Sequence, residues 1–323
     1  MFDIPVLLIA YRRVDNLMEI LNRFNELKVK KIYISLDGPI SGNLDSLVDH
    51  KAMLDAITKF RETYTGNLNT LIRHNNFGCS ASILSACNWI FENETKAVIL
   101  EDDCKPSDDF FKFAEYAAEK LEHENSIWLA CGSQFMDGSE MENSWVLSNY
   151  PLSWGWITLR DKWSEMLQSI LTPTKLINDR FAVAERAYWN AGSVRAQRGF
   201  VDVWDTVLVQ QMLQKNKLAL LPRYNLVSNN GLDSFATNTH RHSPWFNKSF
   251  GIFSIPSKDP HLDQNLDQWL RKVYFGISLR HLVSTKVTSI LDKVGFHKKL
   301  FPLRIRFELA EENRLPIQQN IIK

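Results

Sequence analysis

The sequence predicts an α/β protein with an open, mostly parallel sheet that is flanked by helices. Three observations predict this class. Short apolar runs suited to buried strands alternate with helical patterns through the first hundred residues. The joints between them are short and contain Gly, Pro or Asn. Three consecutive carboxylates, Glu101, Asp102 and Asp103, follow the fourth run, at the strand end where open α/β sheets place their ligands.

Four strands and three helices are predicted in this first part. Asp15 or Asn16 can cap the first helix, and Asp37-Gly38-Pro39 ends the second strand abruptly. The turn at residues 75–78 opens the third helix. Alternation of this kind favours right-handed crossovers and a nucleotide-binding half. The runs that predict the strands are residues 5–10, 31–36, 68–73 and 98–100.

The rest of the chain is less regular. Strands are predicted at residues 127–131 and 218–222, and residues 132–149 and 225–242 are polar, as functional loops are. Helical spacing covers the segments 108–121, 158–171 and 204–214.

The segment from residue 271 to 300 has seven basic residues and one acid, Asp292, with apolar positions at near-helical spacing. Such a basic amphipathic helix can lie on an anionic membrane surface, or pack on the catalytic domain with its lysines in water.

Composition excludes several classes of protein. With 38 Lys plus Arg against 37 Asp plus Glu, the chain lacks the basic charge of a dedicated nucleic-acid binder. The four cysteines have no CxxC spacing, so a zinc site is not predicted. No signal-peptide pattern and no apolar run of about 18 residues is present, so we expect a cytoplasmic protein.

The acidic cluster predicts a metal site. Three adjacent carboxylates repel one another unless a proton or a cation intervenes, and carboxylate oxygens suit Mg²⁺ or Mn²⁺. Asp103 is therefore the candidate metal ligand. The alternative is a solvated acidic turn that caps the helix after it.

Several segments in order resemble glycosyltransferases of the GT-A fold, and among them the N-acetylglucosaminyltransferase I family and related bacterial enzymes. The resemblance runs from Ile4 to about His240. It implies a GT-A catalytic domain at residues 1–255, with a nucleotide-binding half at 1–103 and an acceptor-binding half at 104–255, and a C-terminal extension at 256–323. The segments that carry it are residues 4–10 with Arg13, residues 34–37, Glu101-Asp102-Asp103 with Pro106, Asp109, Phe110 and Phe111, residues 126–128, and Gly155-Trp156.

The resemblance also implies roles in binding a nucleotide sugar. Arg13, beside Ala10 at the end of the first strand, would contact the nucleotide, and Asp37 would contact the uracil. Asp103 would touch the metal, with Glu101 and Asp102 as its neighbours and Asp102 within reach of the ribose. Residues 229–234 with Thr239 and His240 resemble the flexible terminal loop of many GT-A enzymes, so His240 would meet the diphosphate or the metal. His74 could hydrogen-bond at the start of the third helix. The alternatives are that Arg13 is an ordinary surface residue, that Asp37 belongs to an ordinary Asp-Gly-Pro turn and that His240 is a loop histidine without a role.

An inverting transfer needs a general base beside the attacking hydroxyl. Val203-Trp204-Asp205 resembles the Trp-Asp segment that holds this base in the family, so Asp205 is the candidate. The second Asp of the family is replaced by Thr206, and Asp202 is the next candidate. A helix-initiating carboxylate is the alternative explanation for Asp205.

Trp154, Gly155 and Trp156 suit recognition of an acceptor sugar. The apolar face of a pyranose stacks on an aromatic ring, and glycine permits close approach. Aromatic residues are also common in cores, so we expect one of the two tryptophans to be buried for packing.

Together these features predict an inverting, Mn²⁺- or Mg²⁺-dependent glycosyltransferase. It would move a sugar from a nucleoside-diphosphate donor, UDP by resemblance, to a glycan or lipid-linked saccharide, with peripheral membrane contact through the basic tail. One alternative is a sugar-phosphate nucleotidyltransferase, although residues 10–13 lack the Gly-rich loop of that class. The other is a non-catalytic carbohydrate-binding protein on the same fold.

Overall fold

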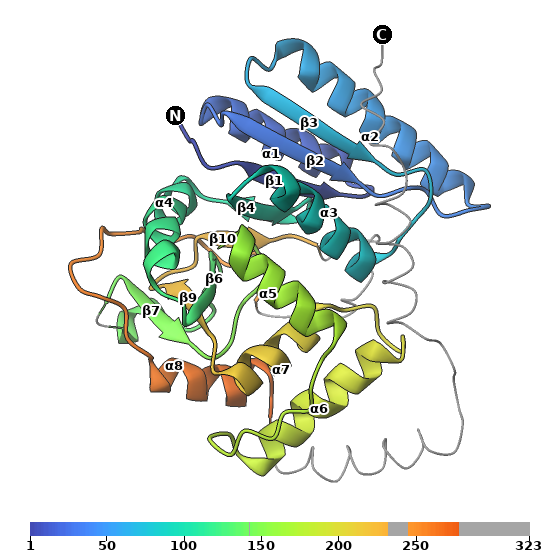
Figure 1. The fold of residues 1–323 in the computed structure, drawn as a ribbon. Coiled ribbons are helices and arrows are strands. Elements are labelled where there is room, and N and C mark those ends of the chain that lie inside the picture. The colour runs from blue at the N-terminus through green and yellow to red at the C-terminus, as the bar shows by residue number, and fades with distance from the viewer. Residues whose placement is uncertain (142, 232–244, 278–323) are drawn as a thin grey trace.

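The computed structural model describes residues 1–141, 143–231 and 245–277. Within these ranges one eight-stranded sheet has the order β3-β2-β1-β4-β8-β6-β9-β7 (Figure 1). Strands β7 and β8 run against the other six, so the sheet is mostly parallel, as predicted. The strands of this sheet are β1 (Val6–Ala10), β2 (Lys31–Leu36), β3 (Asn67–Ile72), β4 (Lys96–Glu101), β6 (Ile127–Cys131), β7 (Trp145–Ser148), β8 (Trp156–Leu159) and β9 (Leu218–Pro222).

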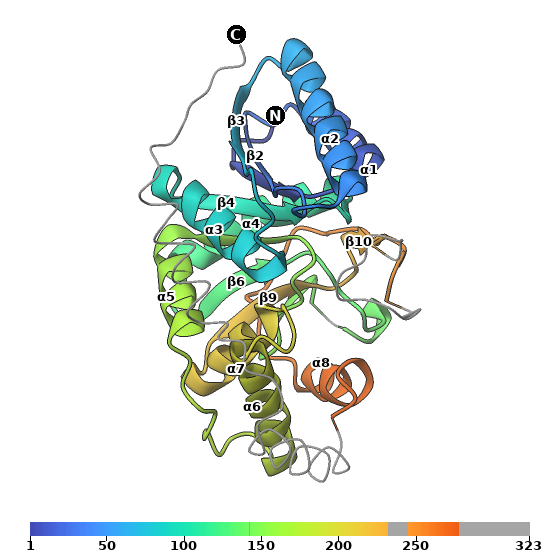
Figure 2. The ribbon, with the colours of Figure 1, turned by 90° about the vertical axis from the view of Figure 1, so that its right-hand side faces the viewer.

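Helices cover both faces of the sheet, which gives two apolar cores. Alternate residues of β1 face opposite sides, Leu7 toward one core and Leu8 toward the other. Figure 2 shows α1 and α2 together on one side of β2 and β3. The core on that side contains side chains of α1 (Val14–Glu26), α2 (Leu44–Thr63) and α4 (Asp108–His123). The other core contains side chains of α3 (Cys79–Asn93), α5 (Arg160–Leu171), α6 (Val183–Gln197) and α7 (Asp205–Lys215).

Several elements differ from the predictions. The polar segment 132–149 contains strand β7, and β8 occupies the start of the segment predicted as helix from residue 158. Helix α6 was not predicted at all. Strands β7 and β8 have only four residues each, which is too short for a period-2 pattern to be recognised in the sequence. Both pair antiparallel inside a mostly parallel sheet.

The strand order places a topological switch point between β1 and β4. The chain leaves β1 toward β2 and β3, then returns to pair β4 on the other side of β1. Ligands of open α/β sheets bind beside such a crevice, at the carboxyl ends of the strands. A small sheet of β5 (Cys104–Pro106) and β10 (Val227–Asn229) lies directly after β4 and brings residues near 229 to this edge.

The described part of the C-terminal extension packs on the rest of the molecule. Helix α8 (Gln264–Trp269) and the π-helix η2 (Leu270–Tyr274) bury Leu266 and Leu270 completely. The segment lies next to β7, where Asp263 N donates to Leu147 O at 3.0 Å. Most of the predicted basic helix lies outside the described residues.

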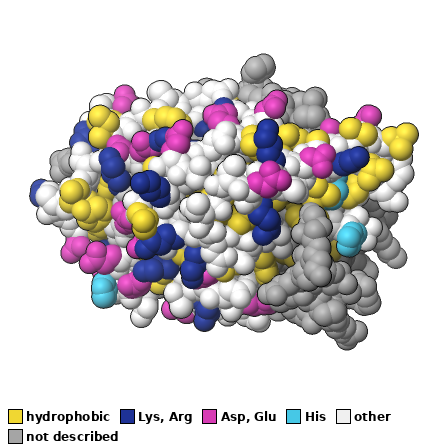
Figure 3. All heavy atoms as spheres, turned by 90° about the horizontal axis from the view of Figure 1, so that it is seen from above, with side chains coloured by type: hydrophobic (Ala, Val, Ile, Leu, Met, Phe, Trp, Pro, Cys, Tyr) yellow, Lys and Arg dark blue, Asp and Glu magenta, His cyan; other side chains and the backbone are white. Residues whose placement is uncertain are grey.

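The surface and the helices add two observations. Lys and Arg side chains are interspersed with Asp and Glu on the face seen from above (Figure 3), as the near-neutral composition predicts. Among the described residues, no helix combines the length and the apolar character needed to cross a membrane.

Asp267 in α8 makes the stability of the fold sensitive to pH. Its carboxylate accepts hydrogen bonds from Ser148 and Asn149, while burial, and to a lesser extent the nearby Glu185, raise its pKa from 3.8 to about 6. The folded state therefore binds this proton more tightly than the unfolded chain does. That stabilisation is present at low pH and is lost as the pH rises through about 6.

We therefore expect the wild-type protein to gain about 1 kcal/mol of unfolding free energy, relative to Asp267→Asn, between pH 7 and pH 5. Urea unfolding at both pH values measures this difference. Equal pH dependence of the two proteins would contradict the assignment to Asp267.

Candidate active site

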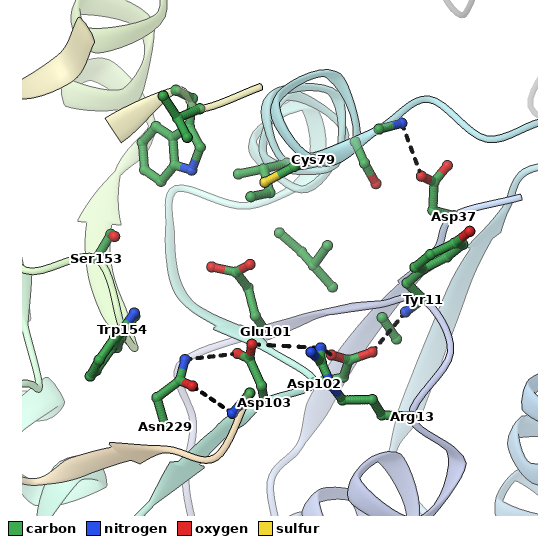
Figure 4. A pocket seen from close by; sticks show the side chains of 18 of the residues that line it. Tyr11, Arg13, Asp37, Cys79, Glu101, Asp102, Asp103, Ser153, Trp154 and Asn229 are labelled. Carbon is green, nitrogen blue, oxygen red and sulfur yellow. Dashed lines mark hydrogen bonds and ion pairs between the residues drawn. The ribbon is translucent and has the colours of Figure 1, made fainter. Parts of the chain in front are cut away.

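The acidic cluster lies in a cavity of about 300 Å³ at the switch point. Figure 4 shows the order of the side chains across it. Asp37 and Tyr11 lie at one end, Arg13 and the three carboxylates in the middle, and Ser153 and Trp154 at the other end. Asp205 also lines this cavity. The fold thus brings together candidate residues from both predicted halves of the catalytic domain.

Asp102 holds the segment after β1 in place. One carboxylate oxygen accepts from Tyr11 N at 2.8 Å, and the other accepts from Arg13 Nη1 at 2.8 Å. Asp102 is buried, and both of its carboxylate oxygens accept hydrogen bonds from within the protein. This arrangement fixes the guanidinium of Arg13 at the cavity wall, where a second ion pair joins it to Asp103 Oδ2 at 3.5 Å.

Asp103 is enclosed by a segment that the sequence places 126 residues further on. Its Oδ1 accepts from Asn229 Nδ2 at 3.1 Å, and Asn230 N donates to the Asp103 main-chain oxygen at 3.0 Å. A Cβ atom on Gly231 would lie 2.4 Å from Asp103 Oδ2, so only glycine fits against this carboxylate. Asn229 and Gly231 belong to the segment that resembles the terminal loop of GT-A enzymes, although the sequence predicts no individual role for either residue.

The cluster carries unfavourable negative charge. Burial raises the pKa of Asp103 to about 6, with Asp102 adding to the effect and Arg13 opposing it. Burial raises the pKa of Glu101 well above its usual value, and Asp103, Asp102 and Asp205 raise it further. Glu101 points into the cavity (Figure 4), and neither of its oxygens accepts a hydrogen bond from a described residue. A bound cation would relieve this repulsion.

The carboxylates of Asp103 and Glu101 fit a divalent ion that takes most of its ligands from waters and a bound phosphate compound. Among the described residues, no group of three or more His, Cys, Asp and Glu side chains is arranged to hold a metal. Mg²⁺ and Mn²⁺ do not require one, since one or two carboxylates, waters and substrate phosphates complete their coordination. Asp103 with Glu101 beside it supplies such carboxylates, and the set contains no soft ligand.

Asp37 has a structural role in addition to lining the cavity. Its carboxylate accepts from Gly38 N, Phe77 N, Gly78 N and the side chain of Asn76, which ties the end of β2 to the turn before α3. Burial raises its pKa to about 6, against the lowering effect of these hydrogen bonds. A uracil contact would have to share these oxygens. His74 is exposed and does not line the cavity, so it is not brought to this site.

Asp202 caps α3 from a distance of more than 120 residues in the sequence. It accepts from Cys79 N at 2.8 Å and Ser80 N at 3.0 Å. The N-cap residue Gly78 has φ of +81°, and a Cβ there would lie 2.6 Å from the Asp202 carboxylate. The start of α3 is thus occupied by a protein carboxylate, and Asp202 is engaged in capping rather than placed in the cavity.

We expect Asp202→Ala to lower the free energy of unfolding by about 1–2 kcal/mol, because two backbone donors lose their charged acceptor. Asp202→Asn keeps one acceptor oxygen and should lose about half as much. Urea denaturation of the three proteins measures the difference. A variant of normal stability would show that the capping contacts contribute nothing.

Asp205 is the first residue of α7, and it faces the cavity. Its Oδ1 accepts from Thr206 N at 2.7 Å, and no described residue donates to Oδ2. Burial raises its pKa, which the hydrogen bonds from Thr206 oppose. The preceding residue, Trp204, is buried against Trp156 with 5.6 Å between the ring centroids, and this packing fixes the start of α7.

The two tryptophans of the aromatic segment have different environments. Trp154 lines the cavity, whereas Trp156 is 1% exposed in the core and cannot stack on a sugar. The expectation that one of the pair is buried is confirmed. Gly155 has φ of +66°, and a Cβ there would lie 2.8 Å from Val227, so glycine is needed for packing rather than for ligand approach. Ala10 lines the cavity, and His240 lies outside the described residues.

Comparisons with known proteins identify no family. No protein-family model and no curated protein matches the chain. A mannose-1-phosphate geranyltransferase from Thermus thermophilus is similar with a TM-score of 0.36 and 10% identity, over 69% of this chain and 74% of that one. A UDP-glucose pyrophosphorylase bound to UDP-glucose has a TM-score of 0.36 and 10% identity, over 68% and 90% of the two chains.

HddC from Yersinia pseudotuberculosis has a TM-score of 0.28 and 14% identity, over 50% of this chain and 78% of that one. Likeness at this level carries no argument about function. The resemblance to the N-acetylglucosaminyltransferase I family therefore stays a prediction.

Proposed function

We propose that this protein is a transferase that acts on a nucleotide sugar with a divalent cation, and that it transfers the sugar to an acceptor hydroxyl. The observation that supports this is the order of groups across one cavity. The acidic cluster and Arg13 lie between an end with Tyr11 and Asp37 and an end with Trp154. A base, a diphosphate and a sugar follow one another in the same order in a nucleotide sugar.

In this proposal the middle of the cavity holds the diphosphate. Arg13 pairs with a phosphate oxygen, and Asp103 with Glu101 beside it would hold Mn²⁺ or Mg²⁺. The ion would neutralise charge that develops on the leaving diphosphate. Asp102 keeps Arg13 in position, and Tyr11 offers a ring to the base. Trp154 offers an apolar face to the sugar or to the acceptor.

Asp205 would act as the general base. Asp205 lines the cavity, and among the described residues no group donates to its Oδ2. Burial raises the pKa of the Cys79 thiol, which lines the same cavity, and Glu101, Asp103 and Asp205 all raise it further. A raised pKa suits a carboxylate that must accept a proton from a hydroxyl. The proton would leave the acceptor as its oxygen bonds to the anomeric carbon and the diphosphate departs.

The second candidate is a sugar-phosphate nucleotidyltransferase. Its support is the same set of carboxylates with Arg13, which could also hold a divalent cation on the phosphates of a nucleoside triphosphate. The segment after β1, Tyr11-Arg12-Arg13, contains no glycine to cradle a triphosphate. A sugar phosphate is also already ionised, so this reaction gives the carboxylate of Asp205 no proton to accept.

Product analysis separates the two candidates. The protein is incubated with UDP-sugars and Mn²⁺, and in parallel with UTP, sugar 1-phosphates and Mn²⁺. Release of UDP in the first mixture supports glycosyl transfer, with water as the acceptor where no saccharide is present. If pyrophosphate is released in the second mixture and no UDP is released in the first, the protein is a nucleotidyltransferase and the proposed glycosyl transfer is wrong. If neither product forms, the protein is a non-catalytic binding protein.

A further inference from the structure

A second, smaller cavity adjoins the candidate active site. Its volume is about 80 Å³, several times the roughly 15 Å³ that one water requires. Ser153, Trp154 and Asp205 line both cavities, so the two spaces meet at the proposed base. A group held in the smaller cavity therefore lies next to the carboxylate that faces the donor.

Five of the twelve residues that line the smaller cavity are aromatic. The ring of Phe135 lies 5.0 Å from that of Trp154 and 4.7 Å from that of Tyr274, and the rings of Trp189 and Phe275 are 4.9 Å apart. The lining also contains the polar side chains of Asp205, Thr206 and Ser153. A cavity that combines aromatic rings with hydrogen-bonding groups suits a sugar ring, which has an apolar face and hydroxyls at its edge.

Tyr274 and Phe275 reach this cavity from the C-terminal extension, and buried polar contacts hold them there. Asp267 accepts from Ser148 Oγ at 2.6 Å and from the backbone of Asn149. Arg271 lies 3.6 Å from Glu185.

Glu185 in turn accepts a hydrogen bond from the Tyr150 hydroxyl. These contacts join α8 to the end of β7 and η2 to α6, so the two aromatic rings are held in the wall of the cavity that Asp205 also lines.

We propose that the smaller cavity binds the acceptor as a pyranose ring, and that Tyr274 and Phe275 determine its specificity. The inference rests on the proposed glycosyl transfer for its chemistry. The acceptor hydroxyl oxygen bonds to the anomeric carbon of the donor, and its proton passes to Asp205. The bond from that carbon to the diphosphate breaks, and the diphosphate leaves with the electron pair.

Binding of methyl pyranosides tests the proposal without requiring turnover. Saturation-transfer NMR is measured for the methyl glycosides of glucose, galactose, mannose and N-acetylglucosamine, with the full chain, UDP and Mg²⁺. We expect at least one glycoside to bind through its ring protons. Phe275→Ala should weaken that binding about tenfold, since a stacked aromatic ring contributes roughly 1.4 kcal/mol.

Two further variants make this result specific. Phe275→Leu keeps an apolar side chain but has no aromatic face, and should also bind weakly even if Phe275→Ala fails to fold. Phe250→Ala removes a 48% exposed ring from a different surface depression and should bind like the wild type. Thermal unfolding confirms that each compared variant is folded.

The outcomes separate this inference from the proposed function. If no glycoside binds the wild type, or if folded Phe275 variants bind as tightly as the wild type does, the acceptor cavity is refuted, even where UDP-sugars release UDP. If glycosides bind but no UDP is released, the cavity stands as a saccharide site, while the proposed transfer reaction fails.

Discussion

Asp205→Asn is expected to lower the rate of glycosyl transfer by roughly 10²–10⁴-fold, the contribution typical of a general base. The amide has nearly the same size and can still accept from Thr206 N, as Oδ1 does at 2.7 Å. It cannot take the proton of the acceptor hydroxyl. The start of α7 stays held by the packing of Trp204 on Trp156. Nucleotide affinity should therefore change little.

Initial rates with a saturating UDP-sugar, and calorimetric titration with UDP and Mn²⁺, measure the two quantities. Asp202→Asn is the matched control, since it neutralises a carboxylate three residues away that caps α3. It should cost stability but leave the chemical step intact. A rate that survives in Asp205→Asn and falls in Asp202→Asn would reverse the two roles.

The same variant discriminates between the two candidate reactions. A hydroxyl nucleophile has to lose a proton, whereas a sugar phosphate attacks as an anion. Pyrophosphate release from UTP and a sugar 1-phosphate should therefore be insensitive to Asp205→Asn. A large loss confined to UDP release would support glycosyl transfer through this residue.

Asp103→Asn should remove most of the metal-dependent turnover, by roughly 10²–10³-fold or more, because an amide oxygen is a weak ligand and leaves the charge on the diphosphate uncompensated. The substitution preserves an oxygen that can accept from Asn229 Nδ2. Calorimetric titration of UDP in the presence and absence of Mn²⁺ should show that the metal no longer strengthens nucleotide binding.

Stability provides an independent measurement for this variant. Burial and the charge of Asp102 raise the pKa of Asp103, so the folded protein destabilises the ionised form of this carboxylate. Its removal should leave the free energy of unfolding unchanged or increase it, as is common for functional sites. Asp108→Asn, at an exposed carboxylate on the first turn of α4, is the control and should alter neither metal dependence nor rate. Normal Mn²⁺-stimulated rates in Asp103→Asn would exclude the metal role.

The sequence by itself determined the four-strand half of the sheet and the position of Glu101, Asp102 and Asp103 at its ligand edge. It did so because long buried strands and their flanking turns leave strong local patterns. The sequence also singled out Arg13, Trp154 and Asp205, and the fold brings all three to one cavity. Asn229 and Gly231 were part of a predicted functional loop, but no pattern connected them with Asp103, which they meet through the pairing of β10 with β5.

Only the tertiary structure decided which of several similar residues faces the cavity. Asp202 and Asp205 look alike in sequence, yet one caps α3 across 122 residues and the other faces the proposed donor. Trp154 and Trp156 are two residues apart, and one lines the cavity while the other is buried. Tyr274 and Phe275 join the site through contacts with β7 and α6. The direction of a side chain is set by packing between segments distant in sequence, and local patterns carry no information about that packing.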